Sequence, residues 1–252
     1  MSVGKIRFFF SFRSPFACIA FHRLRRAPQF KNVDIELCPL WPKVIFGGHM
    51  DDPTASIFKM AYIFQDAARQ AEIAGIRTDY FHQLNNLFRD RFLKPGMDLK
   101  TKKLGAVPQN ETWHIPHIAF LYAQKYGPNK GWEFAEAVFT RRFDLDGNGI
   151  KNVMTEETVE EIANNLGLDG KKAATAHASG EFDEIQNEYI KYGEEDGVFG
   201  VPFFSYMPAD GGAKETFWGN DRIEFLLKTI LDLNYVPSIP KNTLVEVQQS
   251  RL

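Results

Sequence analysis

The strongest constraint on the fold is a change in the spacing of hydrophobic residues along the chain. Residues 6–12 are aromatic and almost continuously apolar, as expected for a strand covered on both faces. Pro15 suits the first turn of a helix, and residues 32–40 then alternate between apolar and polar as in a second strand. This order predicts a β-α-β unit with parallel strands and a right-handed crossover.

The pattern becomes helical after this unit and returns to strand near the end of the chain. From about residue 52 to residue 192, apolar residues recur at the spacing of an amphipathic helix. After Gly197, two apolar runs separated by a turn at residues 210–212 predict a β-hairpin. A final helix is expected to begin with Asn220 as its cap and Asp221 in its first turn.

The two halves, β-α-β and β-β-α, predict an α/β protein with a thioredoxin-like fold that is interrupted by a large all-helical insertion. We expect a discontinuous thioredoxin-like domain over residues 1–50 and 195–235, a helical insertion domain over residues 51–194, and a C-terminal tail over residues 236–252. A length of 252 residues fits one large core carrying an insertion better than two unrelated domains.

Charge and cysteine content restrict the partners and the compartment. The formal net charge of −2 creates no field that would attract nucleic acid or an anionic membrane, so we expect neither as a partner. The two cysteines, Cys18 and Cys38, have neither C-x-x-C nor metal-ligand spacing, which favours buried structural thiols in a reducing compartment. We therefore expect a cytoplasmic protein. A peroxisomal location is the alternative in a eukaryote, because Ser250-Arg251-Leu252 is a variant of the Ser-Lys-Leu peroxisomal address.

The end of the first predicted strand carries the first candidate site residue. Thioredoxin-like proteins place C-x-x-C there, at a helix N-terminus that lowers the pKa of a thiol. This chain has Ser14-Pro15-Phe16-Ala17, so no disulfide can form at these positions. Ser14 is either a simple helix cap or a hydroxyl donor aimed at a negatively charged sulfur.

A Gly-Val-Pro segment before the third predicted strand carries the second candidate. It matches the loop in which thioredoxin folds place a cis-proline opposite the active site, where the main chain of the preceding residue pairs with a bound peptide. Val201 and Pro202 occupy these positions. The alternative is that Pro202 only ends an edge strand.

Three motifs of the chain are Phe10-Ser11-Phe12-Arg13-Ser14-Pro15-Phe16, Gly197-Val198-Phe199-Gly200-Val201-Pro202 and Phe217-Trp218-Gly219-Asn220-Asp221-Arg222. Together they resemble the kappa-class glutathione transferase and 2-hydroxychromene-2-carboxylate isomerase family, within the DsbA-like thioredoxin group. The resemblance extends over nearly the whole chain and implies that Ser14 stabilises a glutathione thiolate, that Val201 gives main-chain contacts beside a cis Pro202, and that the protein is a homodimer.

The resemblance also implies residues that hold the two ends of glutathione. Asn220 and Asp221 would bind the γ-glutamyl end, although an ordinary helix N-cap is the alternative interpretation. Lys59, in a Lys-x-x-Tyr stretch with Tyr62, would approach the glycyl carboxylate.

Some positions depart from the family pattern. The Gly-Asn-x-Pro-Pro segment before the lysine appears as Gly48-His49-Met50-Asp51-Asp52-Pro53, which has no asparagine. Ser11 replaces an acidic residue, and Ala17 replaces the second serine of Ser-Pro-x-Ser. The glutathione site is therefore expected to be remodelled.

These features lead to one main functional expectation and three alternatives. The main expectation is a glutathione-dependent isomerase acting on a small aromatic or conjugated electrophile. A kappa-like glutathione transferase shares the first chemical step, and a non-catalytic glutathione- or peptide-binding protein would have kept only the fold. A disulfide oxidoreductase is the third alternative, disfavoured because serine replaces the redox cysteine.

Two further motifs are interpreted as structural. Asp144, Asp146 and Asn148 resemble the start of a calcium loop, but Thr155 stands where a bidentate glutamate belongs. His114 and His117 lie three residues apart without a third ligand nearby, which favours packing at a helix start over a metal site. No metal is therefore expected.

Overall fold

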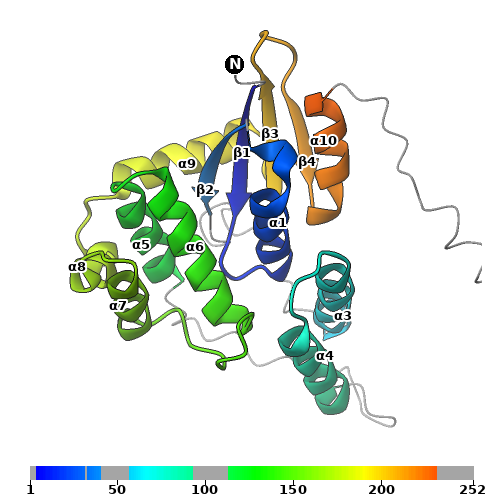
Figure 1. Ribbon diagram of the computed structural model, residues 1–252, viewed down its shortest axis with the longest axis vertical. Coiled ribbons are helices and arrows are strands. Elements are labelled where there is room, and N and C mark those ends of the chain that lie inside the picture. Colours follow the sequence, from blue (N-terminus) through cyan, green and yellow to red (C-terminus); the bar gives the residue numbers. More distant parts are fainter. Residues whose placement is uncertain (1–3, 32, 41–56, 93–112, 232–252) are drawn as a thin grey trace, which may run out of the picture.

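A computed structural model describes residues 4–31, 33–40, 57–92 and 113–231 of the chain (Figure 1). Its centre is a four-stranded mixed sheet of order β2-β1-β3-β4, in which β1 is parallel to β2 and antiparallel to β3, and β4 is antiparallel to β3. The strands are β1 (Gly4–Phe10), β2 (Asp34–Pro39), β3 (Phe203–Pro208) and β4 (Glu215–Trp218). The predicted α/β thioredoxin-like architecture is confirmed.

Helices surround this sheet. They are α1 (Pro15–Arg26), α3 (Ile57–Ile73), α4 (Asp79–Phe92), α5 (His114–Gln124), α6 (Pro128–Phe143), α7 (Glu156–Asn165), α8 (Gly170–Thr175), α9 (Asp183–Glu195) and α10 (Ile223–Leu231). Short 3-10 turns occupy Pro28–Phe30, Ala176–Ala178 and Asn220–Arg222. Among the described residues, no helix combines the length and apolar character needed to cross a bilayer.

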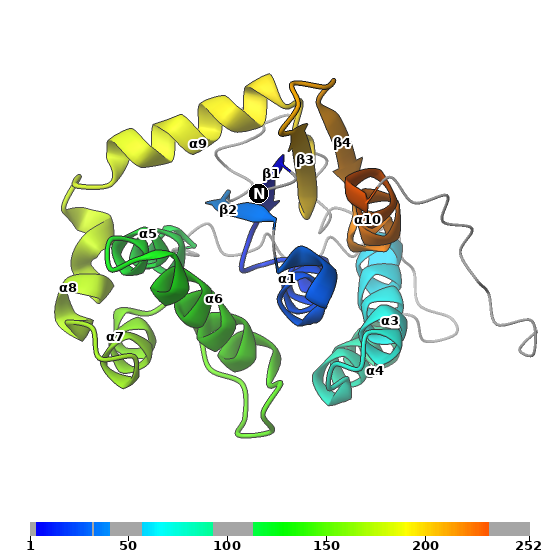
Figure 2. The ribbon, with the colours of Figure 1, turned by 45° about the horizontal axis from the view of Figure 1, so that its top comes forward.

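Strand β1 is covered on both faces, and its consecutive residues Phe8, Phe9 and Phe10 are fully buried. Phe8 and Phe10 point to one face, where the Phe10 ring lies 5.4 Å from the ring of Phe120 on α5. Arg7 points to the other face, with its guanidinium 3.6 Å from the ring centre of Tyr192 on α9. Figure 2 shows α9 and α1 on opposite sides of the sheet.

Helix α1 starts and ends where its sequence favours it. The Ser14 side chain caps the helix by accepting the Ala17 N–H, and Pro15 takes the first helical position, where no intrahelical N–H bond is lost. Three arginines in the last turn face the negative end of the helix dipole. The residues that follow form the crossover to β2, parallel to β1 as predicted.

Some element limits differ from those predicted. Strand β1 ends at Phe10 rather than at residue 12, although the Leu40 N–H still donates to the Phe10 carbonyl at 2.7 Å. The last helix begins at Ile223, after a 3-10 turn whose N-cap is Gly219. The prediction that Asn220 caps the last helix is therefore wrong. The altered segment at residues 48–53, the start of the long helix at residues 52–56, the tail at residues 236–252 and the Ser250-Arg251-Leu252 address lie outside the described residues.

The strand directions bring three distant segments to one edge of the sheet. Because β3 is antiparallel to β1, it begins where β1 ends, and β4 ends at the same edge because it is antiparallel to β3. Residues 11–14, 197–202 and 219–222 therefore lie together. These segments carry the sequence-predicted site residues other than Lys59, which lies on α3.

Candidate functional site

Ser14 lies at the centre of this edge and makes two different hydrogen bonds. Its Oγ accepts the backbone N–H of Ala17 at 3.1 Å, which satisfies an otherwise unpaired donor in the first turn of α1. The Ser14 hydroxyl donates to the carbonyl oxygen of Val201, with 3.4 Å between the two oxygen atoms. Ser14 is therefore both the helix cap and a donor facing the loop before β3.

The chain before Ser14 is held by a histidine from α5. The Phe12 N–H donates to Nε2 of His117 at 3.3 Å, and Nδ1 of the same ring lies 2.6 Å from the Trp113 carbonyl. A ring that accepts at Nε2 and donates at Nδ1 is neutral. Complete burial lowers the pKa of His117 to about 4, so the ring stays neutral near neutral pH.

The two histidines at the start of α5, His114 and His117, have different contacts. We expected His114 and His117 to pack at a helix start, and His117 instead accepts a backbone N–H two residues from Ser14. Their spacing carries no signal for this role, because the partner lies 105 residues earlier in the chain. His114 contacts the ring of His177 at 4.9 Å.

The loop at residues 197–202 presents its main chain to Ser14. The Val201–Pro202 peptide bond is cis, and Val201 is half-buried while Pro202 is buried. The Gly219 N–H donates to the Pro202 carbonyl at 2.9 Å, which joins this loop to the segment after β4. These hydrogen bonds connect the three segments that carry Ser14, Val201 and Asn220.

Asn220 carries a buried acceptor at this edge. The residue is only 2% exposed, and its Oδ1 has no hydrogen-bond partner among the described residues. Its backbone carbonyl accepts a bond of 2.6 Å from Nη1 of Arg23, which fixes the segment against α1. A buried acceptor without a donor is costly.

The other predicted binding residues are exposed. The Asp221 carboxylate lies 3.0 Å from Arg222 at the surface. Lys59 and Tyr62 lie on α3, which packs against α1 and α4, and both side chains face solvent. Their approach to a ligand remains an expectation from the resemblance.

Neither cysteine can take part in disulfide chemistry from its position in the fold. Cys18 and Cys38 are both free and fully buried. Burial raises the pKa of each thiol well above its usual value, which suppresses the reactive thiolate. The first turn of α1 thus offers a hydroxyl and no accessible thiol.

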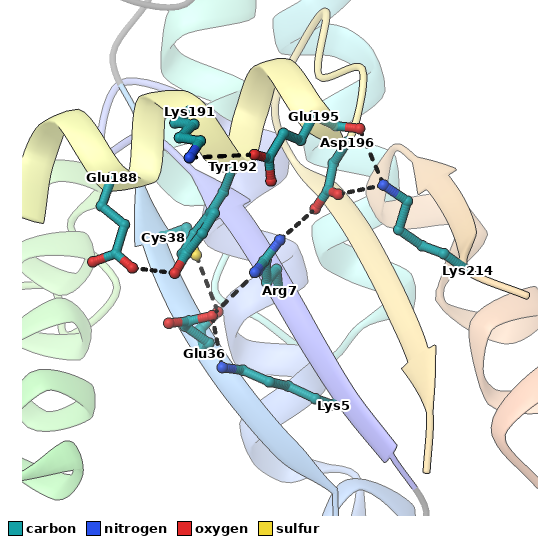
Figure 3. Close-up of polar contacts among 10 residues, drawn as sticks. All are labelled: Lys5, Arg7, Glu36, Cys38, Glu188, Lys191, Tyr192, Glu195, Asp196 and Lys214. Carbon is teal, nitrogen blue, oxygen red and sulfur yellow. Dashed lines mark hydrogen bonds and ion pairs between the residues drawn. The ribbon is translucent and has the colours of Figure 1, made fainter. Parts of the chain in front are cut away.

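A charged cluster lies between α9 and the strands, on the face of the sheet opposite to α1 (Figure 3). The Asp196 carboxylate is 1% exposed and contacts Arg7 at 3.5 Å and Lys214 at 2.6 Å. Arg7 also pairs with Glu36 at 3.4 Å. Asp196 directly precedes the loop at residues 197–202, and Lys214 directly precedes β4, so the cluster ties together two segments that lead to the site.

No metal site is found within the part of the chain that the structure describes, where no three His, Cys, Asp or Glu residues form a suitable group. The loop that resembles a calcium loop is held by its own bonds: the Gly149 N–H donates to Asp144 at 2.7 Å, and Asn148 donates to Asp146 at 2.9 Å. Asp144 ends α6 in the left-handed conformation.

A sheet of this topology, with a helix starting after β1 and a cis-proline loop opposite its first turn, defines a protein of the DsbA-like thioredoxin class with serine in the position of the redox cysteine. Residues 96–231 match the family described as the DSBA-like thioredoxin domain, and the chain belongs to this family. The matched stretch contains Val201 and Asn220 but begins after Ser14.

Solved structures resemble this chain over nearly its full length. A 2-hydroxychromene-2-carboxylate isomerase is 21% identical with a TM-score of 0.62, covering 90% of this chain and 94% of that chain. The cytosolic disulfide reductase DsbM from Pseudomonas aeruginosa is 17% identical with a TM-score of 0.53, covering 90% and 98%. A structure of DsbM with GSH gives 17% identity and a TM-score of 0.52, covering 91% and 100%. At these identities the likeness establishes the fold, and no curated protein matches the sequence significantly.

Proposed function

We propose that this protein binds glutathione and acts as a glutathione-dependent isomerase of the 2-hydroxychromene-2-carboxylate isomerase type on a small aromatic or conjugated substrate. The observation that carries the proposal is the position of Ser14, whose hydroxyl proton faces Val201 across the first turn of α1. The DsbM structure with GSH supports the choice of ligand, and the isomerase among the structural neighbours supports the choice of reaction.

The hydroxyl of Ser14 can cap the helix and stabilise a thiolate at the same time. Capping uses a lone pair of Oγ, which accepts the Ala17 N–H, and leaves the hydroxyl proton free to rotate. Its present bond to Val201, at 3.4 Å, is long for an O–H donor. A charged sulfur near the positive end of α1 is a stronger acceptor than this carbonyl, so Ser14 would turn its proton toward it.

The surrounding residues suit the remaining parts of glutathione. Asn220 would help to hold the γ-glutamyl end, and the Asp221 carboxylate would pair with its ammonium. Val201 would give main-chain bonds to the peptide. Lys59 would neutralise the glycyl carboxylate.

When bound, glutathione supplies a thiolate that adds to a carbon–carbon double bond conjugated to a carbonyl and leaves again after the new single bond has rotated. The carbon–sulfur bond that forms is the bond that breaks, so no electrons are gained or lost overall. Ser14 would lower the free energy of the thiolate both before it adds to the substrate and after it is released. Without this elimination the thiol would stay joined to the substrate, and the outcome would be that of a transferase.

The same reasoning supports two smaller proposals. Two buried reduced thiols fit a reducing compartment, so we place the protein in the cytoplasm. The resemblance to the isomerase and transferase family leads us to propose a homodimer, which light scattering would test.

The decisive experiment measures the pKa of the glutathione thiol in the complex from the ultraviolet absorbance of the thiolate. We expect this pKa to lie below the value of a free thiol, about 8.5. Ser14→Ala should raise it by about one to two units, since one charge-assisted hydrogen bond is lost. Thr155→Ala is the matched control, because Thr155 caps α7 in the same way far along the chain and should leave the pKa unchanged.

Two results would count against the proposal. Absence of glutathione binding by calorimetry removes its premise, and an unchanged thiol pKa in Ser14→Ala reduces Ser14 to a helix cap. If glutathione binds, absorbance spectra of a chromene carboxylate and of a halo-aromatic acceptor, each with and without glutathione, then separate the isomerase from the transferase. Turnover of neither leaves the non-catalytic binding protein.

A further inference from the structure

Arg13 is a half-buried cation that directly precedes Ser14. Within the part of the chain that the structure describes, its guanidinium makes no hydrogen bond, ion pair or ring contact. The other half-buried arginines of that part all have polar partners; they are Arg7, Arg23, Arg141 and Arg142. A charge that is partly removed from water and left unpaired is costly, which favours an anion nearby.

The main chain around Arg13 is fixed by hydrogen bonds. The Arg13 N–H donates to Oγ of Ser11 at 3.3 Å, and the Ser14 N–H donates to the Ser11 carbonyl at 3.0 Å. The Phe12 N–H between these groups donates to His117. Three consecutive N–H groups are thus paired, so the turn that carries Arg13 has a defined position relative to the first turn of α1.

The distance between the Arg13 charge and Ser14 has an upper limit set by covalent geometry. Neighbouring Cα atoms are about 3.8 Å apart, and bonds of about 1.5 Å let an arginine side chain reach roughly 6 Å from Cα to Cζ. The charge therefore lies within about 10 Å of the Ser14 Cα in every rotamer. This is the distance over which a charge still acts in about 0.1 M salt.

Arg13 also determines the net charge of this edge of the sheet. The three segments that meet there contain three charged side chains, those of Arg13, Asp221 and Arg222. Asp221 and Arg222 lie 3.0 Å apart, so their opposite charges largely cancel. Further along α1, Arg23 pairs with Glu224. One positive charge thus remains on these segments and adds to the positive end of the α1 dipole.

We propose that Arg13 stabilises a thiolate beside Ser14 by its charge, in addition to the hydrogen bond that the Ser14 hydroxyl donates. The hydroxyl acts at contact distance, whereas the Arg13 charge acts through space. That the sulfur belongs to glutathione rests on the proposed function. The effect of the charge does not, because it applies to any thiol at this position.

The test places a reporter thiol at the site with Ser14→Cys, so that no ligand is needed. The pH dependence of its alkylation by iodoacetamide gives the pKa of this thiol. Cys18 and Cys38 do not interfere, since burial raises the pKa of both well above the usual value. In this background Arg13→Gln removes the charge and Arg13→Lys keeps it. Arg69→Gln is the matched control, because Arg69 is an exposed arginine on α3.

We expect Arg13→Gln to raise the pKa of the reporter thiol by about 0.3 to 0.8, the effect of a charge about 8 to 10 Å away in a medium close to water. Arg13→Lys should raise it by less than half as much, and Arg69→Gln should leave it unchanged. Increasing the salt from about 0.01 M to about 1 M should reduce the effect of Arg13→Gln, since the charge is then screened. Without the reporter substitution, Arg13→Gln should raise the pKa of bound glutathione by a similar amount.

The proposal is overturned if Arg13→Gln and Arg69→Gln give the same pKa, or if Arg13→Lys raises the pKa as much as Arg13→Gln does. A reporter thiol that responds to Arg13→Gln, in a protein that does not bind glutathione without the reporter substitution, would support the role of Arg13 and refute the proposed function. Bound glutathione whose pKa depends on Ser14, together with a reporter thiol that does not respond to Arg13→Gln, would refute the role of Arg13 alone.

Discussion

Serine in the position of a redox cysteine changes what the first turn of α1 can do. A hydroxyl keeps the cap bond to Ala17 and can still donate its proton, but it cannot form a disulfide. The two thiols of the chain lie elsewhere, Cys18 one turn further into α1 and Cys38 in β2, and both are fully buried. The first turn of α1 therefore carries no sulfur of its own that could react.

Burial of the thiols leads to a prediction about their reactivity. At about pH 8, a thiol reagent should modify Cys18 and Cys38 on the order of 100-fold more slowly in the native protein than in urea, because access and the thiolate form are both suppressed. Kinetics of colour release with an aromatic disulfide reagent measure both rates. Rapid reaction of either native thiol would contradict the structure and reopen the disulfide oxidoreductase alternative.

The loop at residues 197–202 is placed by the elements on either side of it. Asp196 ends α9 against Arg7 of β1 and Lys214 ahead of β4 (Figure 3), and the Val198 N–H donates back to Gly193 at 2.8 Å. A carboxylate that is 1% exposed between two cations is costly to leave unpaired, so these bonds hold the start of the loop firmly. Val201 is presented to Ser14 at the far end of the loop.

Removal of the Asp196 charge should loosen this loop. Asp196→Asn should lower the free energy of unfolding by about 2 kcal/mol and speed hydrogen exchange at residues 197–202, because Arg7 and Lys214 lose a charged acceptor. Glu195→Gln is the control, since it removes only an exposed pair with Lys191 at 3.8 Å and should change stability by less than about 0.5 kcal/mol. Equal effects of the two variants in urea unfolding would contradict this role of the buried cluster.

The core of the protein also contains histidines that must remain neutral. His117 accepts the Phe12 N–H, and His22 on α1 is 4% exposed with its Nε2 unpartnered among the described residues. The pKa of each ring is lowered to about 4, mainly by burial, and nearby Arg26 and Arg25 contribute to the lowering at His22. In the unfolded chain both histidines have a pKa of about 6.5.

The stability of the whole protein should therefore depend on pH in a defined direction. Between pH 6.5 and 4 the unfolded chain binds more protons than the native protein, so the free energy of unfolding should fall as the pH falls. Each histidine contributes at most about 1.4 kcal/mol per pH unit in this window. Urea unfolding at about pH 7, 6 and 5 measures the slope.

Two variants separate the buried histidines from other groups. His22→Leu should reduce the slope by about one proton, and exposed His82→Gln on α4 should leave it unchanged. A slope that is equal in His22→Leu and in the unmodified protein would show that His22 is not buried neutral.

The fold and part of the candidate site could be predicted from local sequence patterns. The apolar run at residues 6–12 predicts a doubly covered strand, Ser14-Pro15 predicts a helix start, and the return of strand character after Gly197 predicts the hairpin, because hydrophobic spacing and capping act over a few residues. The resemblance then singled out Ser14, Val201 and Asn220, which the structure places at one edge of the sheet. The limits of the last helix were less well predicted, since Asn220 lies in a 3-10 turn.

Contacts between residues far apart in the chain could not be predicted from local sequence patterns. His117 accepts the Phe12 N–H across 105 residues, Asp196 contacts Arg7 across 189, and Trp218 covers Gly200 and touches Phe199. Each of these contacts exists because antiparallel pairing and helix packing bring distant segments together, and no spacing along the chain encodes the distance between them. The sequence by itself thus determines which chemical groups this protein has, whereas strand order and packing determine which of them lie close together.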